Sequence, residues 1–244
     1  MRPLLRAELL KLRTTRTFVA LAGTALLLSL LLITLFTLLQ DNWVEQDVRE
    51  LFTGDFTGLF ILLLGVIGMA GEWRHRTITS TVLAAPNRLR LLAAKTIAYA
   101  VAGALISLVV TLVIMAVGTT ILSARDLPTL DLSQLADGLW RNLIVSAFLG
   151  AFGVCIGGLL RNQIVAMVAL LILIFGVEPT ILAVAPEIGQ YGPTSGAPNG
   201  VLQLEAFGED SEILSPPVAL LVLAGWFAAF FAAAAALLQK RDLV

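Results

Sequence analysis

Glu178 is the residue of this chain best suited to chemistry inside a membrane. It lies within an apolar stretch, residues 164–185, and Pro179 follows it directly. An ionisable side chain at that depth is costly unless it faces protein or water, and it is a typical site for ion coupling. Proline removes a helical hydrogen bond, which is tolerated where the backbone is shielded from lipid. We therefore predict an intramembrane polar site at Glu178 and a helix break beside it.

The other patterns that signal catalysis or metal binding are missing from the sequence. His75 is the only histidine and Cys155 the only cysteine, so there is neither a His-Glu-x-x-His zinc motif nor a cysteine cluster. No Gly-x-x-x-x-Gly-Lys-Ser/Thr loop is present to hold ATP phosphates, and no Gly-x-Ser-x-Gly segment is present for a serine nucleophile. We expect that the chain is not an enzyme and that it binds neither a metal nor a cofactor itself.

The residues discussed above lie within or between six long apolar segments of the sequence. The 244-residue chain is 58% hydrophobic and 14% charged, which leaves more apolar surface than a soluble protein of this length could cover. A bilayer core about 30 Å thick needs about 20 apolar residues per helix, and these runs are too long and too uniformly apolar for barrel strands. We predict an all-α integral membrane protein with one transmembrane domain, 1–244. Its spans are 17–39, 56–70, 96–122, 142–160, 164–185 and 217–238.

The charged residues are sorted between the two ends of these spans. Thirteen of the sixteen Lys and Arg residues fall on one side, and only Arg49, Arg125 and Arg141 fall on the other, together with thirteen acids. Short loops rich in Lys and Arg stay in the cytoplasm. Both termini are therefore predicted to be cytoplasmic, in the plasma membrane of a bacterial cell. The net charge of −1 gives no reason to expect a nucleic-acid partner.

Two cytoplasmic elements and one external loop are predicted outside the spans. Residues 1–16 form an amphipathic helix with Leu5, Leu9 and Leu12 on one face, suited to lie on membrane lipids or to contact a cytoplasmic partner. The loop 71–95 contains a short helix, 77–84, which Pro86 ends. Residues 186–216, rich in glycine and proline at their start, form an extracellular loop.

The loop after the second span carries a series of residues at characteristic spacing. They are Glu72, Trp73, Arg74, His75, Arg76, Thr77 and Ile78, followed by Leu83, Pro86, Arg88, Leu91, Leu92 and Lys95. With the N-terminal helix, the six spans and the ending Lys240, Arg241, Asp242, Leu243, this order resembles the permease subunits of ATP-binding-cassette (ABC) transporters of the type-2 exporter class. The family usually has glycine immediately before the threonine, where this chain has Arg76. A tight glycine turn is therefore not expected there.

The resemblance implies a type-2 exporter transmembrane fold and a function. The short helix would be the coupling helix, which docks on a cytoplasmic ABC ATPase subunit, present in two copies, that binds ATP and Mg. A second permease subunit, in a homodimer or a heterodimer, would complete the translocation path. The residues implied in coupling are Glu72, Arg76, Thr77, Ile78, Val82 and Leu83, with Arg6, Glu8 and Lys11 of the N-terminal helix.

An alternative function remains open at this stage. An ion-coupled secondary transporter or channel would use Glu178 to bind the coupling ion. A membrane-embedded enzyme is less compatible with the residues present. No charged residue in the predicted interior selects a substrate, and amphiphiles such as lipids, peptides or drugs are all compatible with an apolar path.

Overall fold

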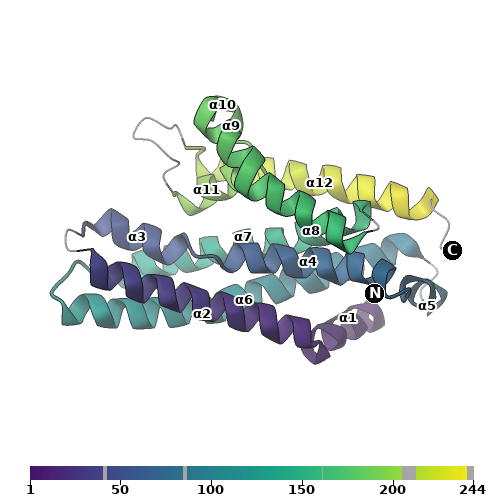
Figure 1. Cartoon of the computed structure of the whole chain (residues 1–244), viewed down its shortest axis with the longest axis horizontal. Helices are drawn as coiled ribbons and strands as arrows, with labels where there is room; N and C mark the ends of the chain where they lie inside the picture. Colours follow the sequence, from purple (N-terminus) through teal and green to yellow (C-terminus); the bar gives the residue numbers. More distant parts are fainter. Residues whose placement is uncertain (41–42, 85–86, 161, 205–212, 241–244) are drawn as a thin grey trace.

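A computed structural model describes residues 1–40, 43–84, 87–160, 162–204 and 213–240. Within these residues the chain is helical, without strands, and it has six helices or helix runs long and apolar enough to cross a membrane (Figure 1). The prediction of an all-helical chain with six segments long and apolar enough to cross a membrane is confirmed for the described residues. The six spans are Arg16–Leu39, Glu45–Arg74, Arg88–Ala124, Leu132–Leu159, Gln163–Val184 and Pro216–Lys240.

The helices follow one another closely along the chain. The first half contains α1 (Arg2–Thr14), α2 (Arg16–Leu39), α3 (Glu45–Thr53), α4 (Thr57–Arg74), α5 (Ile78–Ala84) and α6 (Arg88–Ala124). The second half contains α7 (Leu132–Leu159), α8 (Gln163–Ile172), the π-helical turn η1 (Leu173–Val177), α9 (Glu178–Val184), α10 (Pro186–Gly189), α11 (Gly196–Leu202) and α12 (Pro216–Lys240).

Helix α7 forms the centre of the bundle and packs against α4 and α6. Glycines allow this close approach: a Cβ added at Gly153 would collide with the Leu62 carbonyl oxygen, and one at Gly150 with the Tyr99 carbonyl oxygen. Gly65 on α4 faces the same contact from the other side. The glycine-rich sequence of the fourth span thus fixes the inner layer, to which the remaining helices are added.

Two spans differ from the sequence prediction in their extent. The fourth span was predicted to begin at residue 142, but α7 already begins at Leu132. A capping box at Asp131 with Gln134 starts the helix there, and nothing interrupts it afterwards. Helix α6 likewise begins at Arg88, where the Asn87 side chain accepts a hydrogen bond from the Arg90 amide. Lys95 therefore belongs to a long helix rather than to a loop.

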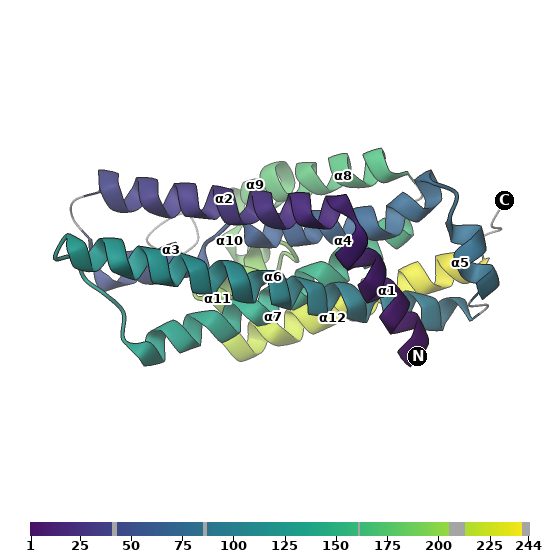
Figure 2. The ribbon, with the colours of Figure 1, turned by 90° about the horizontal axis from the view of Figure 1, so that it is seen from below.

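The two ends of the bundle carry different elements. Helices α1 and α5 lie at one end, together with the end of α12, while α3 lies at the other (Figures 1 and 2). We call these the basic end and the acidic end, after their charges. Several residues assigned to loops and tails from the sequence lie outside the described residues: Asp41, Pro86, Arg161, Glu205, Glu209, Asp210, Glu212, Arg241, Asp242 and Leu243.

Candidate functional site

The most unusual feature of the basic end is a lysine buried between two carboxylates. The Nζ of Lys95 lies 2.6 Å from Glu8 Oε2 and 2.9 Å from Glu72 Oε1, and it donates a third hydrogen bond to the Gly68 carbonyl oxygen at 3.3 Å. Lys95 is only 1% exposed, Glu8 3% and Glu72 7%. Charged side chains are almost never so buried unless they are paired, and here each one is.

A second lysine completes the arrangement. The Nζ of Lys11 lies 3.0 Å from Glu8 Oε1 and 2.9 Å from Glu72 Oε1, and its side chain is half exposed. We call Glu8, Lys11, Glu72 and Lys95 the ion cluster; its formal charges sum to zero. The Lys95 ammonium also lies 5.8 Å from the centre of the Tyr99 ring, a favourable cation–π contact.

Three elements from different parts of the chain supply the ion cluster. Glu8 and Lys11 lie three residues apart on α1 and so share one face of that helix, next to the buried Leu12. Glu72 lies in the last turn of α4, and Lys95 lies about two turns into α6. The ion cluster therefore attaches the N-terminal helix to two of the membrane spans.

The charges of the ion cluster support one another. Burial alone would raise the pKa of Glu8, but the ammonium groups of Lys95 and Lys11 outweigh it and hold that pKa below its ordinary value. Burial would lower the pKa of Lys11, but the carboxylates of Glu72 and Glu8 keep that pKa above its ordinary value. Glu8 and Lys11 are consequently both charged across the neutral pH range.

A tight turn links the ion cluster to α5. The Thr77 amide donates to the Glu72 carbonyl oxygen at 3.0 Å, and the Arg76 amide donates to that of Trp73 at 3.2 Å, which is the Schellman pattern of helix ends. Arg76 has a φ of 56°, the left-handed conformation that glycine adopts most easily. The turn that was not expected without glycine therefore forms, with Arg76 in the glycine position.

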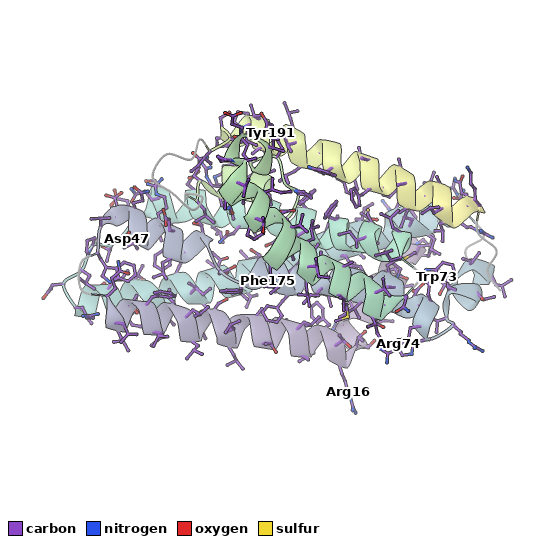
Figure 3. The ribbon with its side chains drawn as sticks, turned by 45° about the horizontal axis from the view of Figure 1, so that its top comes forward. Arg16, Asp47, Trp73, Arg74, Phe175 and Tyr191 are labelled. Carbon is purple, nitrogen blue, oxygen red and sulfur yellow. The ribbon has the colours of Figure 1, made fainter. Side chains whose placement is uncertain are left out.

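Helix α5 has a buried face and one exposed apolar residue. Ile78 is 3% exposed and Val82 8%, whereas Leu83 is 80% exposed. Ile78 and Val82 thus pack within the chain itself, and of the residues predicted to couple to a partner, Arg76, Thr77 and Leu83 are exposed. Figure 3 shows that Trp73 and Arg74, at the end of α4, lie at the same end of the bundle as Arg16, while Asp47 lies at the opposite end.

The structure separates the three residues predicted on the N-terminal helix. Arg6 and Lys11 are exposed, whereas Glu8 is buried in the ion cluster and is closed to a partner. Lys95 was not predicted as a site residue. The sequence did contain an indication of this role, because Lys95 directly follows the apolar run Leu91, Leu92, Ala93, Ala94. An ammonium group buried among such residues requires a partner.

Glu178 is far from the ion cluster and has different partners. It is 4% exposed, and its carboxylate accepts hydrogen bonds from the Thr194 amide at 3.0 and 3.2 Å and from the Ser195 amide at 2.6 Å. No helix break is found before Pro179; the π-helical turn η1 comes immediately before Glu178 and leads into α9. The carboxylate thus holds the loop that follows α10, and its predicted role in ion coupling stays a hypothesis.

Among the described residues, no group of three or more His, Cys, Asp or Glu side chains is placed to hold a metal ion. The ion cluster is instead suited to hold helices together and to transmit movement between them. No protein-family model matches the chain, and no curated protein matches it either.

Proposed function

We propose that the chain is the permease subunit of an ABC exporter of the type-2 class, with cytoplasmic termini in the plasma membrane. A separate cytoplasmic ATPase, in two copies, binds ATP and Mg and drives it. The observation that carries this proposal is the ion cluster, because it joins α1, α4 and α6 directly beside the turn that leads into α5. Through these elements the cytoplasmic ATPase would move the membrane spans.

A mechanical path from α5 into the membrane follows from these contacts. A displacement of α5 passes through the short turn at 75–77 into α4, and through Glu72 into α1 and α6 at the same time. A buried ion pair resists separation, because removing one partner leaves an uncompensated charge. Helices α1, α4 and α6 would therefore move together with α5, and α5 would not move alone.

A second permease subunit, identical or different, would complete the path. The spans differ greatly in how far this chain covers them: 72% of the most apolar window of α7 is buried, against 17% in α2 and 17% in the run Gln163–Val184. Uniformly apolar exposed faces suit lipid or another subunit.

Leu83 offers the sharpest test, because it is exposed and no buried contact depends on it. The chain is co-expressed with a candidate ATPase, unchanged or carrying Leu83→Asp. The matched control is Leu132→Asp, since Leu132 is 83% exposed at the acidic end.

An apolar contact at the centre of a protein interface is worth about 2 kcal/mol or more, so Leu83→Asp should weaken co-purification at least about tenfold. It should also abolish stimulation of ATP hydrolysis, and Leu132→Asp should do neither. Unchanged association and stimulation in Leu83→Asp would contradict the proposal.

A further inference from the structure

A cavity of about 730 Å³ lies beside the ion cluster at the basic end. Its walls come from α1, the start of α2, α4, α5, α6 and the first residue of α8. Phe18, Leu64 and Ile67 give it an apolar side, and Arg74 and His75, both exposed, give it a basic rim. The cavity lies near Arg16, where α2 begins, and Arg74, where α4 ends; both residues are labelled in Figure 3. Because α2 and α4 belong to predicted membrane spans, these ends are where the spans would meet the membrane surface.

Two hydrogen-bond acceptors in this cavity are buried and have no partner among the residues that the structure describes. They are Oε2 of Glu72 and Oε1 of Gln163, and both residues line the cavity. The Glu72 side chain is more than nine-tenths buried, and its ion pairs with Lys11 and Lys95 both use the other oxygen, Oε1. Lys95 cannot serve Oε2 as well, because its three N–H groups already bond to Glu8, Glu72 Oε1 and Gly68.

The chemistry of these two atoms defines what the cavity can hold. A carboxylate oxygen and an amide oxygen only accept hydrogen bonds, so a single group that served both would have to donate at least two hydrogen bonds. A positive charge on that donor strengthens its bond to a carboxylate. A primary ammonium group meets both conditions, whereas a quaternary ammonium has the charge but no N–H.

We propose that this cavity binds a primary ammonium group through Glu72 and Gln163. Its position at the membrane surface, its apolar wall and its basic rim match an ethanolamine phospholipid. The phosphate of such a lipid would lie toward Arg74, and its acyl chains would lie along the apolar side. A soluble amine of the same headgroup chemistry is the other source. The inference does not depend on the proposed transport function, because it uses only the cavity and its unpaired acceptors.

Lipid binding to the purified full-length chain tests this proposal by native mass spectrometry. Phosphatidylethanolamine and phosphatidylcholine with the same acyl chains are compared, since their headgroups have the same net charge and differ in N–H donors. A charge-assisted hydrogen bond is worth about 1.5–3 kcal/mol, so the ethanolamine lipid should bind about tenfold more tightly or better. Equal binding of the two lipids would overturn the proposal.

Two variants separate the cavity from other lipid contacts. Gln163→Leu removes one acceptor without touching the ion cluster, and it should reduce the preference for the ethanolamine lipid about threefold or more. Gln190→Leu, in the turn after α10, is the matched control and should leave the preference unchanged. Glu72→Gln should abolish the preference, but it also disturbs the ion cluster. A preference that is not reduced in Gln163→Leu would therefore count against the site even if Glu72→Gln fails to fold.

The source of the ammonium group is decided in the same experiment. O-phosphoethanolamine, the headgroup without acyl chains, is added to lipid-free protein. If it binds alone and displaces the ethanolamine lipid at similar concentration, the natural ligand is a soluble amine. If it binds at least about a hundredfold more weakly, as expected when buried acyl groups contribute about 0.8 kcal/mol per CH₂, the ligand is a membrane lipid.

Discussion

Glu72 and Glu178 are both buried glutamates of a membrane chain, but they are stabilised in different ways. Glu72 is paired with two lysines from two other helices, and one of its oxygens is left without a partner. Glu178 instead accepts hydrogen bonds from the backbone amides of Thr194 and Ser195 in one loop. The first arrangement connects separate helices, and the second fixes a local chain path. Burial of an acid therefore does not by itself indicate a transport site.

Replacing the lysine of the ion cluster should have the largest effect. Lys95→Met leaves Glu8 and Glu72 buried with only the half-exposed Lys11 beside them. Breaking a buried ion pair from one side costs about 3–5 kcal/mol, so the melting temperature of the detergent-solubilised chain should fall sharply. Protease should also cleave α1 much faster.

Lys240→Met is the control for this comparison, because Lys240 ends α12 and is exposed. It should leave both the melting temperature and the cleavage rate unchanged. If Lys95→Met were as stable as the parent, the ion cluster would not be the attachment of α1.

Replacing the other glutamate should have a smaller and more local effect. Glu178→Gln keeps an oxygen acceptor but loses its charge, which weakens bonds to the Thr194 and Ser195 amides by about 1–3 kcal/mol. Hydrogen exchange of these two amides should accelerate, while exchange at the basic end stays the same. The matched control is Glu187→Gln, which is exposed.

The same variant tests the alternative function. An ion-coupled transporter would lose transport and its pH dependence in Glu178→Gln. An ATP-driven exporter would continue to transport in Glu178→Gln as long as ATP is supplied.

The ion cluster should also respond to pH in a defined direction. The pKa of Glu8 is lowered from its ordinary value of 4.5, so its contribution is present above pH 4.5 and is lost as the pH falls below that value. The pKa of Lys11 is raised from 10.5, so its contribution is present below pH 10.5 and is lost above it. Attachment of α1 should therefore be constant between these limits and weaken on both sides.

Spin labels at Leu10 on α1 and Leu89 on α6, both exposed, report this attachment in a Cys155→Ala background. The distribution of distances between the two labels should broaden well below pH 4.5. This should occur at a higher pH than the change in a control pair at Leu27 and Val109, which reports unfolding of the bundle. A distance that changes only together with the control pair would show that α1 is held by other contacts.

The smallest effect is expected at the turn between α4 and α5. Arg76→Gly relieves a left-handed conformation that costs a side chain about 1 kcal/mol, and part of this gain is offset by the greater freedom of glycine in the unfolded chain. The melting temperature should rise slightly. Arg90→Gly, within the first turn of α6, should lower it instead, and a fall in Arg76→Gly would show that the arginine side chain stabilises the turn.

The sequence predicted the spans because apolar length depends on local composition alone. It also predicted that a short helix follows Glu72. It did not predict the ion cluster, since Glu8, Glu72 and Lys95 are distant in sequence and only the packing of α1, α4 and α6 brings them together. Nor did it predict the partners of Glu178, because backbone amides of a glycine-rich loop leave no residue-type signal. Val82 illustrates the same limit: its apolar character suggested a partner surface, but it packs against its own chain.

The side of the membrane on which the basic end lies tests the central claim most directly. Leu83→Cys and Leu132→Cys, at opposite ends and equally exposed, are each expressed in a Cys155→Ala background. Intact cells are treated with a membrane-impermeant maleimide. The account predicts that position 132 is labelled in intact cells and position 83 only after the membrane is opened. Labelling of position 83 from outside would place α1 and α5 away from any cytoplasmic ATPase and contradict the proposed function.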